Sequence, residues 1–330
     1  MQTTPQTPIG VEVTGLDLRA GLDDEQVAAL RTLLAEHGVA VLPGQDGLDD
    51  DDFAAFLARF GEITFTPGET PVPGRDDLNV VSNVGRTTPP RSVFHVDTSY
   101  VSRPPTYTAL RAVTIPAAGG ETLFTNQYRA YETLPGDIRS HLAGRRVTHV
   151  VSGLAPEDAG PETSAEHPVF RRHPVSGRTS LYLSTPERCV EISGMDRGAS
   201  RTTIGYLYEH STAEDNVFRH AWSPGDVVIW DNGCVLHRAD HAAALALGAA
   251  LARLLGGGGG EGGLGGEVRH GRVAPVVRQT ELHEVRFVRE RVHGQQLHRG
   301  DPRLNQRGKL LDRCAKGAFL RERADMDFRD

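Results

Sequence analysis

The sequence contains few cysteines. Only three of its 330 residues are cysteine (Cys189, Cys234 and Cys314), and no two of them lie close together. Disulfide frameworks and zinc sites both need cysteines, or cysteines and histidines, at short paired spacings. The cysteine pattern therefore supports neither of them, and it favours a reducing, cytoplasmic setting.

Long apolar runs and an excess of positive charge are also missing. No segment approaches the about 20 apolar residues of a membrane-spanning helix, and residues 1–10 lack the basic start and apolar stretch of a secretory signal. The net charge of −7 gives no reason to expect nucleic acid or an anionic membrane as a partner. Contents of 38% hydrophobic and 24% charged residues are typical of a soluble globular protein.

The order of apolar patterns predicts helices first and strands afterwards. Residues 22–38 carry a helical apolar stripe with Asp23 or Asp24 as the cap, and residues 48–63 repeat the pattern behind a run of acids. From about residue 78 to 242, short apolar runs broken by Gly and Pro predict many short strands and one further helix. The pattern predicts an α+β protein with a sandwich, barrel or jelly-roll core.

The composition changes after residue 242. Residues 243–330 contain 16 Lys and Arg against 11 Asp and Glu, whereas residues 1–242 contain 20 against 32. Residues 256–271 include ten glycines in sixteen positions, and glycine at this density loses too much backbone entropy on ordering to suit a packed core. We expect residues 1–242 to form the folded domain and 243–330 to be a poorly ordered, Gly-rich tail.

One short stretch, FHVDTSY at residues 94–100, pairs a histidine with a carboxylate. His95 and Asp97 lie two positions apart in a run that alternates like a strand, so they project to the same face. They either decorate a solvated face of a sheet or converge on one target. An imidazole nitrogen and a carboxylate oxygen suit a divalent first-row metal, for which a facial triad would need one more histidine.

Longer segments around this pair resemble the taurine/2,4-D dioxygenase (TauD/TfdA) family of Fe(II)- and 2-oxoglutarate-dependent oxygenases. That family has a His-x-Asp followed by Pro-Pro, a further strand and a Gly-Gly-[Asp/Glu]-Thr turn, as in FHVDTSYVSRPPTYTALRAVTIPAAGGETLFTN. HPVFRRHPVSGRTSLYLS and WSPGDVVIWDNGCVLHRAD resemble two later family segments, the second of which bears the distal histidine. The resemblance spans about residues 8–242, with all its blocks in order.

The resemblance implies a double-stranded β-helix, or jelly roll, with Fe(2+) at its open mouth. Carried over residue by residue, it makes His95, Asp97 and His237 the iron ligands and Thr122 a contact of the 2-oxoglutarate carboxylate. The implied reaction consumes 2-oxoglutarate and O2, hydroxylates a small organic substrate, and releases succinate and CO2. Related halogenases lack the carboxylate ligand, so the presence of Asp97 favours oxygenation. A homo-oligomer remains open.

The substrate is harder to infer. The taurine-specific branch of the family carries a histidine where this chain has Thr66, which removes a donor to a sulfonate. Thr66, Thr98, Tyr100 and Tyr182 are candidate pocket residues. Tyr100 would share a strand face with Asp97 only if the alternation broke. A sulfonate, an aryloxy or alkyl carboxylate and an intermediate of specialised metabolism all remain open.

The family pattern breaks beyond the distal histidine. Members of the family carry an arginine roughly ten to fifteen residues further on, on the last core strand, which pairs with the distal carboxylate of 2-oxoglutarate. Here Arg253 follows His237 by 16 positions, inside an Ala/Leu stripe rather than a β-rich run. The last core strand is therefore expected to be missing or altered. The alternative function is a catalytically impaired, metal-binding relative that cannot anchor 2-oxoglutarate.

Two explanations of the tail are open: a reading-frame shift in a GC-rich gene, and a lineage-specific extension in which Arg253 serves through a shift of register. Out-of-frame GC-rich codons yield Gly, Ala, Arg and His, so a frame shift predicts a gene whose corrected frame restores family sequence after residue 242. Resequencing the gene across codons 240–260 checks this. An in-frame result, together with a protease-resistant tail in the purified protein, would remove the frame-shift explanation.

Overall fold

The computed structural model describes most of the first 240 residues and one later strand. The described residues are 1–64, 70–82, 93–115, 119–154, 156–160 and 162–240, together with the backbone of 281–289. Thr66, Arg253 and the glycine-rich segment 256–271 lie outside them. The sequence-based expectations at those positions therefore stay predictions.

Two of the predicted helices lie near the start of the chain, and an acidic side chain caps the N-terminus of each. Helix α1 (Asp24–His37) begins with a capping box, in which Asp23 accepts from the backbone of Gln26 and the Gln26 side chain accepts from the backbone of Asp23. In α2 (Asp50–Ala58), the Asp49 side chain accepts from the N–H of Asp52. Each cap satisfies backbone donors that have no partner within the helix. The later helices are α3 (Gln127–Glu132), α4 (Gly136–Leu142) and α5 (Arg197–Ser211), with short 3-10 turns η1 (Leu18–Ala20), η2 (Pro156–Asp158) and η3 (Glu214–Asn216).

The principal sheet has eight strands, in the order β1-β2-β3-β14-β6-β16-β4 with β5 paired to β16. Its pairs are antiparallel apart from β2 with β3. The strands are β1 (Gln2–Pro5), β2 (Val11–Thr14), β3 (Val39–Leu42), β4 (Glu62–Thr64), β5 (Asn79–Ser82), β6 (Tyr107–Thr114), β14 (Val227–Asp231) and β16 (Glu281–Arg289). The sheet thus takes one strand, β16, from the region beyond residue 242.

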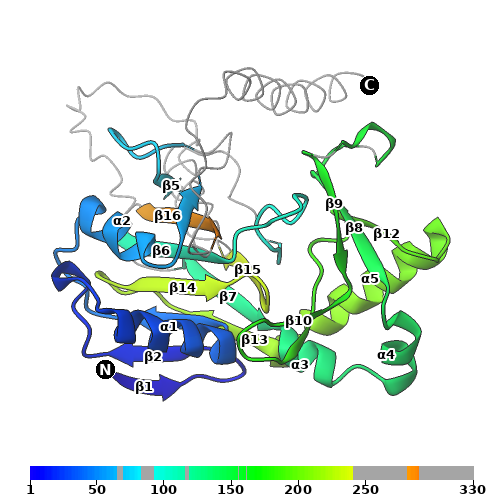
Figure 1. The fold of residues 1–330 in the computed structure, drawn as a ribbon, viewed down its shortest axis with the longest axis horizontal. Helices are drawn as coiled ribbons and strands as arrows, with labels where there is room; N and C mark the ends of the chain where they lie inside the picture. The colour runs from blue at the N-terminus through cyan, green and yellow to red at the C-terminus, as the bar shows by residue number, and fades with distance from the viewer. Residues whose placement is uncertain are drawn as a thin grey trace, which may run out of the picture.

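Three smaller sheets complete the architecture, in the orders β13-β7-β15, β12-β8-β9 and β10-β11. Their strands are β7 (Glu121–Asn126), β8 (Arg146–Val150), β9 (Ser164–Pro168), β10 (Phe170–Arg172), β11 (Thr179–Leu181), β12 (Cys189–Ile192), β13 (Val217–His220) and β15 (Val235–Asp240). In Figure 1, β7, β13 and β15 lie beside the principal sheet, while β8, β9 and β12 form a separate lobe with α4 and α5.

Alternation along the strands of the principal sheet builds a core on each of its faces. Leu30 and Phe53, from the two N-terminal helices, pack with Val11, Ala109 and Ile229 on one face. On the other face, Val41, Leu110, Val228 and Trp230 pack with Phe124 and Val235 of the small β13-β7-β15 sheet. Adjacent residues of one strand, such as Val228 and Ile229, therefore serve opposite cores. The fold is a sheet-rich core, two sheets thick, with helices on its outer face.

Gly38 joins α1 to β3 where three elements meet. Its φ of 70° lies in the left-handed region, which costs a residue with a Cβ about 1–2 kcal/mol. A Cβ would also lie 2.6 Å from Ile9 Cδ1 and 2.8 Å from Val235 Cγ2. The Gly38 carbonyl accepts from the N–H of Asp231 at the end of β14. The position needs glycine both for its conformation and for its space.

We expect Gly38→Ala to destabilise the fold more than Gly44→Ala. Gly44 has the same φ of 70°, but a Cβ there meets nothing within 4 Å. Gly44→Ala should therefore cost about 1–2 kcal/mol for conformation alone, and Gly38→Ala about 1–3 kcal/mol more for overpacking. Urea unfolding of the two variants measures the difference. Equal losses would show that the contacts around Gly38 relax freely.

Candidate metal centre

A backbone bridge brings the two candidate histidines together. The N–H of His95 donates to the carbonyl of His237 and the N–H of His237 donates to the carbonyl of His95, both at 3.0 Å. The strand expected over residues 92–101 is reduced to this bridge in its described part, because residues 97–100 form a turn. His237 itself lies in β15, after the strand and turn that its sequence predicts. Segments far apart in sequence therefore meet at the two histidines.

The third candidate ligand faces both rings. Asp97 Oδ1 lies 3.6 Å from His95 Nε2, and Asp97 Oδ2 lies 3.8 Å from His237 Nε2. One ligand atom from each residue lies within 4.8 Å of the other two. Nitrogen and oxygen ligands at about 2.1 Å from one six-coordinate ion lie about 3 Å apart in adjacent positions. The three side chains therefore fit a single divalent ion after small closing movements.

The hydrogen bonds of His95 and Asp97 suit metal binding. His95 Nδ1 lies 3.0 Å from the carbonyl of Val93, and because a carbonyl only accepts, Nδ1 carries the proton. His95 Nε2, which faces Asp97, therefore keeps its lone pair for a metal. The Asp97 side chain is only 2% exposed, and Oδ2 accepts from Thr108 Oγ1 at 2.7 Å. A carboxylate so deeply buried suits a site where a cation balances its charge.

Apolar and aromatic groups line the side of the centre next to His237. The Trp230 ring lies 4.6 Å from the His237 ring, and the Phe124 ring lies 6.5 Å from it. Both belong to the core between the principal sheet and the β13-β7-β15 sheet. The His237 side chain is 10% exposed. The centre thus lies at the margin of a dry core, which strengthens electrostatic interactions within it.

Thr122 lies on the same face of β7 as the metal centre. It pairs with Ala239, and Phe124 pairs with His237, so the two-residue period of strands places all four side chains on one face. Thr122 is 4% exposed. Its Oγ1 accepts from Trp222 Nε1 at 3.0 Å. The structure therefore brings Thr122 to the metal side of the sheet.

The other candidate pocket residues lie in different surroundings. Thr98, at φ 39°, is the only described residue other than glycine with a positive φ, and it belongs to the turn that follows Asp97. Tyr100, in the same turn, lies beneath the guanidinium of Arg188, which is 5.3 Å from its ring. The turn thus breaks the strand alternation, which was the condition for Tyr100 to lie on the same side as Asp97.

Tyr182 is 2% exposed and packs with Phe94, Val96, Leu123 and Leu236. Val96 and Leu236 flank the ligands in sequence, so Tyr182 lies against the sides of those segments that face away from the metal.

Sequence reasoning missed two buried residues of the centre, Thr108 and Asn232. Asn232 Nδ2 donates to Thr108 Oγ1 at 2.9 Å, and Thr108 bonds to Asp97. A weak signal existed for Thr108, since a polar residue inside the apolar run TYTALRAV occupies an inward position. Neither contact follows from sequence spacing, because three separate segments supply the partners.

The fold brings two histidines and one carboxylate together inside a β core, where they could hold one metal ion. A family model described as "Taurine catabolism dioxygenase TauD, TfdA family" matches residues 2–248. The chain belongs to this family of 2-oxoglutarate-dependent dioxygenases. Members use Fe(II), 2-oxoglutarate and O2.

Several relatives match most of their own length. The chain is 31% identical over 267 residues to an alpha-ketoglutarate-dependent 2,4-dichlorophenoxyacetate dioxygenase of Cupriavidus pinatubonensis, covering 71% of this chain and 89% of the relative. It is 31% identical to an alpha-ketoglutarate-dependent sulfate ester dioxygenase of Pseudomonas putida, covering 70% and 81%. A crystal structure of a taurine dioxygenase from Burkholderia xenovorans is 28% identical, covers 88% of this chain and 91% of its own, and superposes with a TM-score of 0.67.

The described residues contain no helix that is both long and apolar enough to cross a membrane.

A buried histidine beside the turn of Thr98 and Tyr100 makes stability depend on pH. His149 of β8 is fully buried, and its Nδ1 lies 2.9 Å from Ser99 Oγ. Burial, with smaller contributions from His167 and Arg188, lowers the pKa of His149 well below its usual 6.5. Below pH 6.5, therefore, His149 binds a proton in the unfolded chain but stays neutral in the folded chain, and the free energy of unfolding falls.

We expect His149→Asn to flatten the loss of stability below pH 6.5. The wild-type free energy of unfolding should fall more steeply than the variant's, by up to about 1.4 kcal/mol per pH unit. Urea unfolding between pH 5 and 7 measures both slopes. His141→Asn, at an exposed position of α4, is the matched control and should keep the wild-type slope. Parallel slopes for His149→Asn and wild type would contradict the assignment.

Proposed function

We propose that the protein hydroxylates a small organic acid, sulfonated or carboxylated, in a reaction that consumes 2-oxoglutarate and O2 and releases succinate and CO2. The observation that carries this proposal is the convergence of His95, Asp97 and His237 within 4.8 Å at the edge of a dry core. We place the protein in the cytoplasm on the basis of its cysteine pattern. The two packed sheets support a jelly-roll assignment for the core.

His95, Asp97 and His237 would hold the iron, which supplies the activation of O2 that the protein's own side chains cannot perform. The chain's contribution is positioning. His95 presents Nε2 because its Nδ1 proton is committed to Val93. The rings of Trp230 and Phe124 exclude water from the side of His237.

Thr122 is proposed as a contact of the 2-oxoglutarate carboxylate. The indole N–H of Trp222 can only donate, and it points at Thr122 Oγ1. The hydroxyl therefore keeps its own proton for another acceptor, and a carboxylate oxygen is a strong one. Arg253 is proposed as the second contact, on its distance from His237 in the sequence alone. An arginine there would bind the far carboxylate through two parallel hydrogen bonds.

The substrate class follows from the relatives and from the turn after Asp97. The relatives named above act on a phenoxyacetate and on sulfate esters, both of which carry an anionic group. We propose an anionic small molecule here as well, with Thr98 and Tyr100 at the pocket beside Asp97. Thr66 and Tyr182 remain proposed pocket residues on the family resemblance. The strained backbone of Thr98 supports a functional role for this turn.

The division of the chain bears on a second candidate function. We propose residues 1–242 as the catalytic domain and 243–330 as a Gly-rich tail whose described strand, β16, pairs within the principal sheet. The end of the family match at residue 248 supports this boundary. If the tail does not supply the arginine, the protein would bind iron without turning over 2-oxoglutarate. Turnover therefore separates the dioxygenase from the impaired relative.

We expect purified protein with Fe(II) to release succinate from 2-oxoglutarate only when O2 is present. His95→Ala should lower this rate by at least about 100-fold because it removes a metal ligand. His141→Ala, an exposed histidine of α4, should keep the wild-type rate. Succinate release and O2 uptake measure both, with sulfonates and aryloxy acids added as candidate substrates. Iron binding without succinate release would contradict the dioxygenase and support the impaired relative.

A further inference from the structure

We propose that Thr108 and Asn232 form a hydrogen-bonded chain that positions the Asp97 carboxylate for the metal. This inference rests on the proposed function, because it assigns Asp97 as a ligand. Asn232 Nδ2 donates to Thr108 Oγ1 at 2.9 Å, and Thr108 Oγ1 donates to Asp97 Oδ2 at 2.7 Å. Thr108 is fully buried, and Asn232 and Asp97 are each 2% exposed.

The chemistry of the three groups determines which of them donates each hydrogen bond. An amide nitrogen only donates, so Asn232 gives a proton to the Thr108 oxygen. An ionised carboxylate only accepts, so the single Thr108 proton goes to Asp97. The hydroxyl thus acts as an acceptor on one side and a donor on the other, and each hydrogen bond strengthens its neighbour.

The backbone around Thr108 and Asn232 is rigid. Thr108 lies inside β6, where it is paired with Trp230 of β14 and with Arg286 of β16. Its β-branched side chain has few rotamers on a strand. The N–H of Asn232 donates to the carbonyl of Thr106 at 2.9 Å. Thr108 and Asn232 are therefore both anchored where β6 begins and β14 ends.

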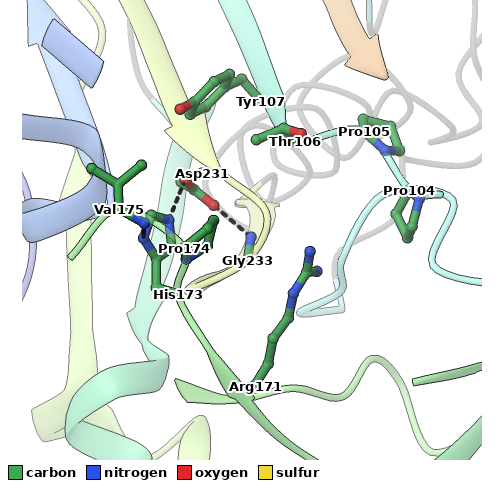
Figure 2. A pocket seen from close by; sticks show the side chains of 10 residues that line it. All are labelled: Pro104, Pro105, Thr106, Tyr107, Arg171, His173, Pro174, Val175, Asp231 and Gly233. Atoms are coloured by element: carbon green, nitrogen blue, oxygen red, sulfur yellow. Dashed lines mark hydrogen bonds and ion pairs between the residues drawn. The ribbon is translucent and has the colours of Figure 1, made fainter. Parts of the chain in front are cut away.

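A second pair of contacts fixes the turn that carries Asn232. His173 Nδ1 accepts from the N–H groups of Val175 and Ser176, so its proton is on Nε2, which donates to Asp231 Oδ2 at 3.0 Å. Asp231 Oδ1 accepts from the N–H of Gly233 at 2.7 Å. Figure 2 shows His173 and Gly233 both contacting Asp231 at the end of the yellow-green strand. His173 therefore helps to fix the turn that carries Asn232.

The hydrogen bonds from Asn232 through Thr108 affect how Asp97 would bind a metal. Thr108 donates to Asp97 Oδ2, while Oδ1 faces His95 Nε2 at 3.6 Å. Thr108 therefore helps to set the orientation in which the carboxylate, together with the two histidines, would hold the ion. Thr108 is therefore a positioning residue, which acts through Asp97.

The test is anaerobic titration of the full chain with Co(II), whose visible absorption reports both affinity and coordination, without 2-oxoglutarate or O2. Thr108→Val removes the hydroxyl at nearly constant volume and should weaken Co(II) binding about 10-fold. Thr108→Ser restores the hydroxyl and should recover most of the affinity. Thr125→Val is the matched control, because Thr125, in β7, is also fully buried but accepts from the Gln127 side chain of α3. Thermal melts of each variant show that it is folded.

The outcomes separate this inference from the proposed function. Weak Co(II) binding by folded Thr108→Val, with normal binding by Thr108→Ser and Thr125→Val, supports the positioning chain even if the protein shows no turnover. Wild-type affinity and an unchanged spectrum in Thr108→Val overturn it, although the dioxygenase assignment survives. Equal weakening in Thr125→Val also overturns it, because the effect would then be a general one of removing a buried hydroxyl. Failure of the wild-type chain to bind Co(II) contradicts the proposed function and this inference together.

Discussion

The metal centre depends on the backbone pairing of His95 with His237. Two hydrogen bonds of 3.0 Å join a short segment at the start of the strand region to β15 near its end. Because paired residues of antiparallel segments present their side chains to the same face, this one contact turns both rings toward Asp97. Helices, sheets and turns elsewhere in the molecule matter to the site mainly by fixing these two segments.

The core between the sheets decides what the site can do. The principal sheet turns Trp230 and Thr108 toward this core, and the β13-β7-β15 sheet turns Phe124 and His237 toward it. A buried carboxylate is costly unless charges or donors compensate it, and here one donor comes from Thr108. A divalent ion bound at the site would compensate the charge further. The burial of Asp97 therefore favours the binding of a cation beside it.

Sequence reasoning was most successful where local chemistry decides the outcome. Asp23 caps α1 because its side chain meets a backbone donor three residues on, which depends on nothing distant. Partners from separate segments, such as Trp222 with Thr122, could not be found from spacing. The strand-like alternation of the sequence continues through Thr98, but in the structure a turn interrupts the strand there. The place of β16 in the principal sheet depends on pairing with strands that are distant in the sequence, and composition does not predict such pairing.

The most direct test is a crystal structure determined anaerobically with Mn(II) in place of Fe(II), using anomalous scattering to locate the ion. We predict one anomalous peak bonded to Nε2 of His95, to an oxygen of Asp97 and to Nε2 of His237, at about 2.0–2.3 Å from each. A peak elsewhere, or one that only two of these side chains reach, would contradict this prediction.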